Sequence, residues 1–270
     1  MSGRITTPLR PPIRRALAGA AGPMLGGHLA AVRRGETRLG GIAPRPLVVA
    51  VLAVGPQPGA STLVALLAQA FAGLAPDRVA VLDADGVHQP QRFRLGTDDG
   101  GSLRQLVADP HAWRFRRTVE RYLARGAGVP LLAAALPERG QVLDVAQLRA
   151  GLHVLRRRYP VVLIDVPAQA SADVLAWAVR AADHVIITAG DTSAAEPALQ
   201  WLNGIRTDEA QVTVIARAGR GMARGIDVVM PDDASLAGYG QVRILELRLP
   251  ALAAVEQVTA RLTTSWARDS

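Results

Sequence analysis

Residues 47–74 read LVVAVLAVGPQPGASTLVALLAQAFAGL, and this stretch decides the fold. Its first eight residues, Leu47–Val54, are apolar and largely β-branched, which indicates a strand buried on both faces. The loop Gly55–Thr62 follows, and the apolar residues from Ser61 to Leu74 predict a helix. A strand, a Gly-containing loop and a helix N-terminus together present backbone N–H groups and a positive dipole end, an arrangement that suits phosphate. Proline and glycine also occur in ordinary turns, and the hydroxyl residues of the loop could simply cap the helix.

The same alternation continues to the end of the chain. Further strands are expected at 79–82, 129–135, 161–164, 184–188, 212–216, 226–230 and 242–247, and further helices at 102–108, 113–125, 145–158, 170–181, 194–205 and 251–266. Strands that alternate with helices favour a doubly wound α/β domain with a mostly parallel sheet and helices on both faces. We expect this domain to span residues 46–270.

All 31 basic residues of the chain are arginine. Eight of them lie within residues 1–45 with a single acid, Glu36, so this segment carries +7 of the net charge of +8. The segment is rich in Gly and Pro and lacks the periodic apolar pattern of a packed domain. We therefore expect an N-terminal interaction arm over residues 1–45, the alternative being an arm that folds back on the domain. Its expected partner-binding residues are Arg4, Arg10, Arg14, Arg15, Arg33 and Arg34.

The composition excludes several classes of protein. Cysteine is absent, which excludes disulfide scaffolds, thiol nucleophiles and thiolate metal sites and is typical of a reducing cytoplasm. The five histidines show no metal-ligand spacing. No apolar run approaches the roughly 18–20 residues of a membrane-spanning helix, and the last expected helix has too few basic residues to favour a membrane surface. We expect a cytoplasmic protein whose membrane contact, if any, is peripheral.

Acidic residues follow two of the expected strands. Asp83 and Asp85 come directly after residues 79–82, and Asp165 comes directly after residues 161–164. Ligands of open α/β sheets bind at the carboxyl ends of the strands. Each acid by itself could also be a helix cap or a turn residue.

With these segments in this order, residues 46–265 resemble the ParA/MinD-like branch of the P-loop NTPases, whose loop reads K-G-G-x-G-K-[ST]-[ST]. Asp83-Ala84-Asp85 looks like the family's D-x-D segment, Asp165–Gln169 like its D-x-P-x-G segment, and Ala181–Ile187 like the strand that follows. The resemblance implies ATP and magnesium as ligands. It places nucleotide at Gly55, Gly59, Ala60, Ser61 and Thr62, and magnesium at Ser61, Asp85 and Asp165.

The departures from that pattern concern the positive charges. Gly55 and Ala60 stand where the family has its two lysines, and the chain contains no lysine to replace them. Pro56 and Pro58 have no N–H group to donate to phosphate. Because phosphoryl transfer depends on positioning and charge neutralisation, we expect weak or no ATP-magnesium binding and no efficient ATPase activity. The surviving acids, Asp85 included, could be relics that brace the sheet.

The expected function is therefore that of a pseudo-ATPase acting as a binding, scaffolding or positioning component. The layout is similar to MinD-like proteins of actinobacteria, some linked to type VII secretion, and to pilus-associated relatives. The expected partners are proteins, in a homodimer or in a heterodimer with an ATP-competent relative. Two alternatives remain open. One is an active ATPase in which an arginine such as Arg92 or Arg94, or a residue of a partner protein, replaces the lysines. The other is a positioning protein that binds DNA nonspecifically.

Overall fold

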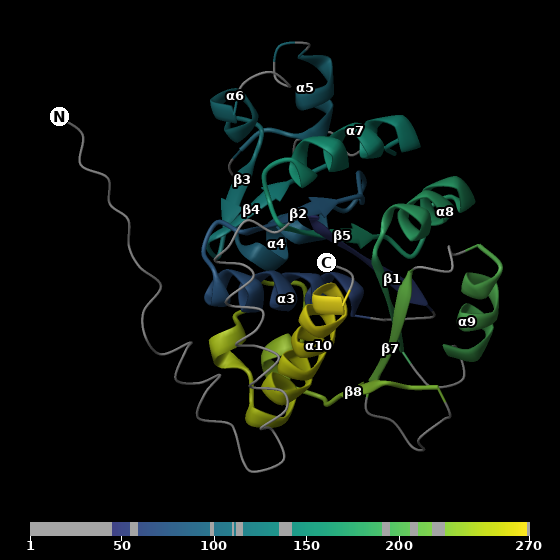
Figure 1. The fold of residues 1–270 in the computed structure, drawn as a ribbon. Coiled ribbons are helices and arrows are strands. Elements are labelled where there is room, and N and C mark those ends of the chain that lie inside the picture. The colour runs from purple at the N-terminus through teal and green to yellow at the C-terminus, as the bar shows by residue number, and fades with distance from the viewer. Residues whose placement is uncertain are drawn as a thin grey trace.

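Within the described residues, eight strands form one sheet in the computed structural model (Figure 1). The structure describes residues 45–54, 59–97, 100–109, 111, 116–134, 142–190, 195–205, 210–217 and 225–268. The strands are β1 (Leu47–Val54), β2 (Val79–Asp83), β3 (Ala124–Gly126), β4 (Val129–Leu132), β5 (Val161–Val166), β6 (His184–Ala189), β7 (Gln211–Arg217) and β8 (Val228–Met230). Their order is β3-β4-β2-β5-β1-β6-β7-β8, and all neighbouring pairs are parallel except β3 and β4. The doubly wound fold class is confirmed.

Helices cover both faces of this sheet (Figure 1). They are α3 (Ala60–Leu74), α4 (Pro90–Leu95), α5 (Leu103–Ala108), α6 (Arg116–Glu120), α7 (Val145–Arg156), α8 (Ala172–Ala181), α9 (Ala195–Asn203) and α10 (Leu249–Arg268). The central strand β1 shows why two layers are needed. Its residues Val49 and Val51 join the core beneath α3 and α10, whereas Val48 and Ala50 join the core beneath α7 and α8. A strand that is apolar on both faces is stable only between two such layers.

Helix α3 follows β1 and is apolar almost all round, as a fully enclosed helix must be. Phe71 is completely buried, and α10 packs both against α3 and against β8 of the sheet. Val255, Val258 and Leu262 of α10 are completely buried as well. The expectation that the last helix packs on the domain is confirmed. Among the described residues, no helix is long and apolar enough to cross a membrane.

The strand expected at 242–247 is wrong. This segment forms a single 3₁₀ turn at Ile244–Glu246. The buried side chain of Gln69 on α3 donates to the carbonyl of Val242 at 2.9 Å and accepts from the N–H of Ile244 at 3.1 Å. One glutamine thus satisfies the backbone groups that a neighbouring strand would have satisfied, so the apolar side chains pack on α3 instead of extending the sheet.

The helix expected at 113–125 is only partly correct. Its described helical part is α6, after which the chain turns into β3 and pairs antiparallel with β4. Ala127 and Gly128 join these strands with φ values of 49° and 79°, as a two-residue hairpin requires. Arg125 therefore lies on a strand, where it forms an ion pair with Asp77 at 2.8 Å.

Two sets of expected site residues lie outside the described residues. The first is the arm, including Arg4, Arg10, Arg14, Arg15, Arg33 and Arg34, because the description begins at Arg45. The second is Gly55 and the rest of the loop through Pro58. The expectations for both sets stay predictions.

Candidate functional site

The candidate site lies at the carboxyl edge of β1, β2 and β5, where α3 begins. Gly59 is the N-cap of α3 with φ 71° and ψ 14°, a left-handed conformation that favours glycine. A Cβ atom placed on Gly59 would meet none of the described residues within 4 Å, so its glycine identity is explained by its φ value and not by crowding. The first turn contains Ala60, Ser61 and Thr62 and no acid. These expected nucleotide-binding residues therefore sit at a helix N-terminus, as the sequence predicts.

Ala60 occupies the position at which the resemblance places a phosphate-binding lysine. Its methyl side chain is buried, with 5% of the residue exposed. The positive charge offered by the described part of the loop is therefore limited to the N-terminus of α3, equivalent to about half an elementary charge.

Two buried carboxyl groups lie side by side at the ends of β2 and β5. Asp83 and Asp165 are register partners in the parallel pairing of these strands, and both are buried. Burial, and then the neighbouring Asp165 carboxylate, raises the pKa of Asp83 well above its usual range. Burial raises the pKa of Asp165 to about 6, against the opposing effect of hydrogen bonds from Gln91 and Ser61. The register thus brings Asp83 next to Asp165, although the sequence analysis had placed Asp85 there.

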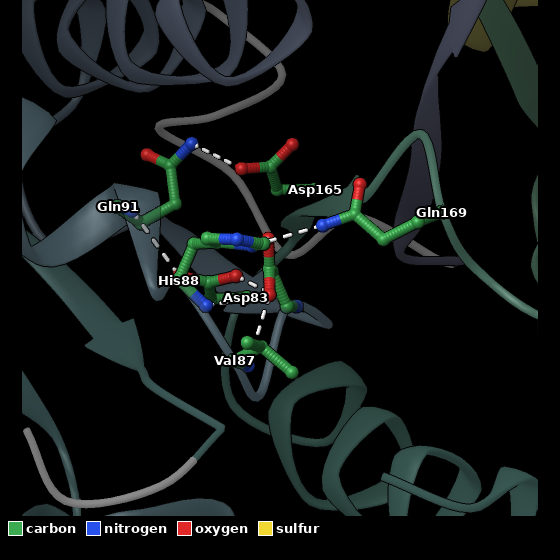
Figure 2. Close-up of polar contacts among 7 residues, drawn as sticks. Asp83, Val87, His88, Gln91, Asp165 and Gln169 are labelled. Atoms are coloured by element: carbon green, nitrogen blue, oxygen red, sulfur yellow. Dashed lines mark hydrogen bonds and ion pairs between the residues drawn. The ribbon is translucent and has the colours of Figure 1, made fainter. Parts of the chain in front are cut away.

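Gln91 joins the elements of the site, as Figure 2 shows. Its side-chain Nε2 donates to Asp165 Oδ2 at 2.7 Å and to the carbonyl of Ser61 at 2.9 Å. Its backbone N–H donates to Asp83 Oδ2 at 3.1 Å. One residue of α4 therefore links α3, β2 and β5. The sequence analysis missed Gln91 because α4 was not expected and only the arginines of this segment, Arg92 and Arg94, were considered for the site.

Two oxygen atoms of this network remain without a donor. Gln91 Oε1 and Asp165 Oδ1 are buried, and no described group hydrogen-bonds to either. A buried carboxylate oxygen without a donor is costly. It is a position at which a cation, a water molecule or a proton would be stabilised. The Ser61 hydroxyl lies close enough to Asp165 to lower its pKa, and the assignment of Asp165 to magnesium stays a prediction.

Asp85 is engaged in a turn. Its Oδ1 accepts from the N–H groups of Val87 and His88 at 2.9 and 2.8 Å, and its Oδ2 lies 3.1 Å from His88 Nδ1. The same imidazole nitrogen, Nδ1 of His88, lies 2.9 Å from Nε2 of Gln169, a residue of the loop after β5 (Figure 2). Gln169 stands where the family segment ends in glycine, and its side chain ties the loop after β5 to the turn after β2. A carboxylate used in this way braces the turn, which fits the reading of Asp85 as a structural relic.

The residues present fit a magnesium ion in part. Among the described residues, no group of three His, Cys, Asp or Glu side chains could hold a metal ion. Magnesium commonly uses only one or two protein ligands and keeps several waters. Ser61 and Asp165 could supply such a pair, while Asp85 would have to leave its turn to join them.

The two arginines considered as lysine substitutes have structural contacts. Arg92 is buried, and it donates to Gln89 Oε1 at 3.1 Å and to the carbonyl of Gly101 at 3.0 Å. Arg94 donates to the carbonyls of Gly238 and Gly240 at 2.7 and 3.2 Å. Its charge also lowers the pKa of Asp165, so Arg94 lies within electrostatic range of the site. A phosphate-binding role for either arginine would require it to give up these contacts.

Solved structures share this arrangement of strands and helices. MinD of Aquifex aeolicus, in a MinC:MinD cell division complex, is 20% identical, with 80% of this chain and 95% of that chain covered and a TM-score of 0.62. This chain has the MinD/ParA fold. The MinD protein of Pyrococcus horikoshii OT3 complexed with Mg-ADP is 16% identical over 79% of this chain and 94% of that one, with a TM-score of 0.57. A ParA family ATPase from Chlorobium tepidum TLS is 13% identical over 83% and 98%, with a TM-score of 0.55.

These identities are low, and the likeness shows the MinD/ParA fold alone. No protein-family model matches the sequence, and no curated protein matches it either. The expected resemblance is thus confirmed at the level of the fold.

Proposed function

We propose that this protein is a positioning or scaffolding component built on the MinD/ParA fold, with a nucleotide site too weakly charged for efficient ATP hydrolysis. The observation that carries the proposal is Ala60, a buried methyl group in the first turn of α3 at the position of the family's phosphate-binding lysine. The chain has no lysine elsewhere. Pro56 and Pro58 further reduce the number of backbone donors in the loop.

The missing lysines should lower the rate of ATP hydrolysis more than they change the fold of the domain. Catalysis of phosphoryl transfer rests on positioning and on neutralising the charge of the transferred group, and the loss of a cationic finger costs about 10³–10⁵ in rate. The helix N-terminus and backbone amides of α3 could still receive a phosphate group. Weak binding without efficient turnover is the expected result.

The metal side of the site is better preserved. Ser61 and Asp165 would hold magnesium, which would supply positive charge to offset that of a bound phosphate group. The side chain of Gln91 donates hydrogen bonds to Asp165 Oδ2 and to the carbonyl of Ser61. It keeps α4 attached to α3 and β5, so the site is held together by the protein's own side chains.

The proposed role is to bind proteins. The solved relatives include a MinD in complex with MinC, and the MinD/ParA fold here has lost charge at the loop while retaining its core. Partners in a homodimer, or in a heterodimer with an ATP-competent relative, fit such a role, as does docking through the arginine-rich arm. A secretion or pilus machine would be a setting for it.

Isothermal titration with ATP and magnesium, together with a phosphate-release assay, tests the nucleotide site. We expect an affinity weaker than about 10 μM, or roughly −7 kcal/mol, and no turnover above background. The variant Ala60→Lys should bind ATP-magnesium at least tenfold more tightly. The matched control Ala60→Gln adds a side chain of similar length without charge and should leave binding unchanged.

Three results would overturn the proposal. Tight ATP binding by the natural chain would do so, as would phosphate release that depends on Asp165 or Arg94. Equal improvement by Ala60→Lys and Ala60→Gln would show that charge is not the missing element.

A further inference from the structure

Helices α7 and α8 lie on the face of the sheet opposite α3 and α10 (Figure 1). Residues of these two helices line a groove. It has a volume of about 1030 Å³. Residues along both helices line it, and at one end it reaches Pro46, which precedes β1. Pro46 lies at the amino end of the parallel strands, whereas Asp165 lies towards their carboxyl end. This end of the groove is therefore far from the candidate nucleotide site.

The rim of the groove is strongly basic. Four basic residues on α7 and at its C-terminal end line the groove: Arg149, His153, Arg156 and Arg157. Their spacing of four, three and one residues places them on one side of the helix. Arg180 of α8 also lines the groove. One acid, Asp173, lines the groove with them. Arg180 donates from Nε to the carbonyl of Ala176. None of the rim arginines forms an ion pair within the described part of the chain.

Ordinary helix electrostatics explains only part of this rim. Basic residues near the C-terminus of a helix complement its dipole, which accounts for Arg156, Arg157 and Arg180. The dipole does not account for Arg149, which lies in the second turn of α7, or for the convergence of two helices' arginines on one groove. Arg158 provides the contrast: its side chain is only 9% exposed and pairs with Glu120 at 3.0 Å. Of three consecutive arginines, one stabilises the fold and two line the groove.

The floor of the groove is apolar. Leu152 of α7 and Trp177 of α8 line it and are almost fully buried, and Val145 lines it near the start of α7. The groove therefore combines an apolar floor with a rim of guanidinium groups.

We propose that this groove docks a glutamate- or aspartate-rich segment of a partner protein that also carries apolar side chains. Guanidinium groups bind carboxylates in a bidentate manner, and the apolar floor can receive a leucine or an aromatic side chain. The chain's own arm is excluded as the occupant because it carries eight arginines and a single acid.

Nucleic acid is a poorer fit for the same groove. Asp173 would face the phosphates. Residues 46–270 also hold 23 arginines against 22 acids, which gives too little excess charge for a broad phosphate-binding surface. The proposal is independent of the nucleotide site, since no residue of the groove belongs to that site.

A synthetic peptide tests the proposal with the full-length protein. The probe is a fluorescein-labelled 14-residue peptide of glutamate and leucine, with leucines every three or four residues and one photo-crosslinking residue, studied at physiological salt. Fluorescence anisotropy should show that the double variant Arg149→Gln/Arg157→Gln binds at least tenfold more weakly than the natural chain. The matched control Arg104→Gln, an exposed arginine on α5, should bind within twofold of it.

Crosslink mapping separates the groove from the arm. We expect crosslinks within residues 145–157 and 172–181, and circular dichroism should show that the double variant is folded. A peptide with serine in place of leucine should bind several-fold more weakly. Equal affinity of the double variant, or crosslinks confined to residues 1–44, would overturn the proposal. So would a 15-nucleotide DNA that binds more tightly than the peptide and loses affinity in the double variant.

Discussion

Glu256 of α10 should make the protein less stable as the pH rises from 4.5 to about 7. The residue is 8% exposed, its Oε1 is buried, and no described group hydrogen-bonds to that atom. Burial raises the pKa of Glu256 to about 7 from an ordinary value of 4.5. The folded state therefore holds a proton that the unfolded state releases.

The magnitude follows from proton linkage. Between the two pKa values the folded state binds about one proton more than the unfolded state, so the free energy of unfolding falls by about 1.4 kcal/mol per pH unit. The contribution of Glu256 is thus neutral near pH 4 and destabilising by up to about 3 kcal/mol at pH 8. Glu256→Gln removes the ionisation and keeps the shape. It should raise the free energy of unfolding by about 2–3 kcal/mol at pH 8 and change it little at pH 5.

Urea unfolding at pH 5, 6, 7 and 8, followed by tryptophan fluorescence, measures this difference. Asp83 and Asp165 also have raised pKa values, so the quantity to compare is the difference between variant and natural chain at each pH. Glu246→Gln is the control, because Glu246 is exposed and pairs with Arg243 at 3.3 Å on the surface. Surface pairs contribute at most about 1 kcal/mol. Parallel pH curves for the natural chain and Glu256→Gln would refute the reasoning.

Three other substitutions test separate parts of the fold by the same urea titrations. Asp144→Ala should cost about 0.5–2 kcal/mol, because the Asp144 side chain accepts from an N–H in the first turn of α7 and forms a capping box; Asp144→Asn should retain most of that stability. Gly126→Ala should cost about 1–3 kcal/mol, since its Cβ would lie 2.5 Å from the carbonyl oxygen of Leu95, and an unchanged stability would contradict that packing. Gln91→Leu should cost about 1–3 kcal/mol through the lost donor to Asp165. Because the hydrogen bond from Gln91 lowers the pKa of Asp165, this cost should be larger at pH 8 than at pH 5, and a cost independent of pH would refute that role.

Hydrophobic pattern by itself predicted the central strands, for a reason that β1 illustrates. A parallel strand covered by helices on both faces needs apolar residues at successive positions, so Leu47–Val54 is visible as a continuous apolar run. β3 lacks such a run because it has only three residues, Ala124–Gly126, at the edge of the sheet. The apolar residues after Val242 fit the pattern of a strand. The side chain of Gln69, 173 residues earlier, donates a hydrogen bond to the Val242 carbonyl, so that carbonyl does not pair with a neighbouring strand.

The functional residues also differ in whether local sequence or tertiary packing places them. Local sequence was sufficient to place Ser61 at a helix start and Asp165 at a strand end, because both positions follow from the element that carries them. Gln91 lies 30 residues from Ser61 and 74 from Asp165. Only strand order and register, which are set by packing across the whole sheet, bring it into contact with both. The groove has the same origin. The sequence shows the arginines of α7 and α8, but only the packing of these helices side by side, α7 on β5 and α8 on β1, brings those arginines to one groove.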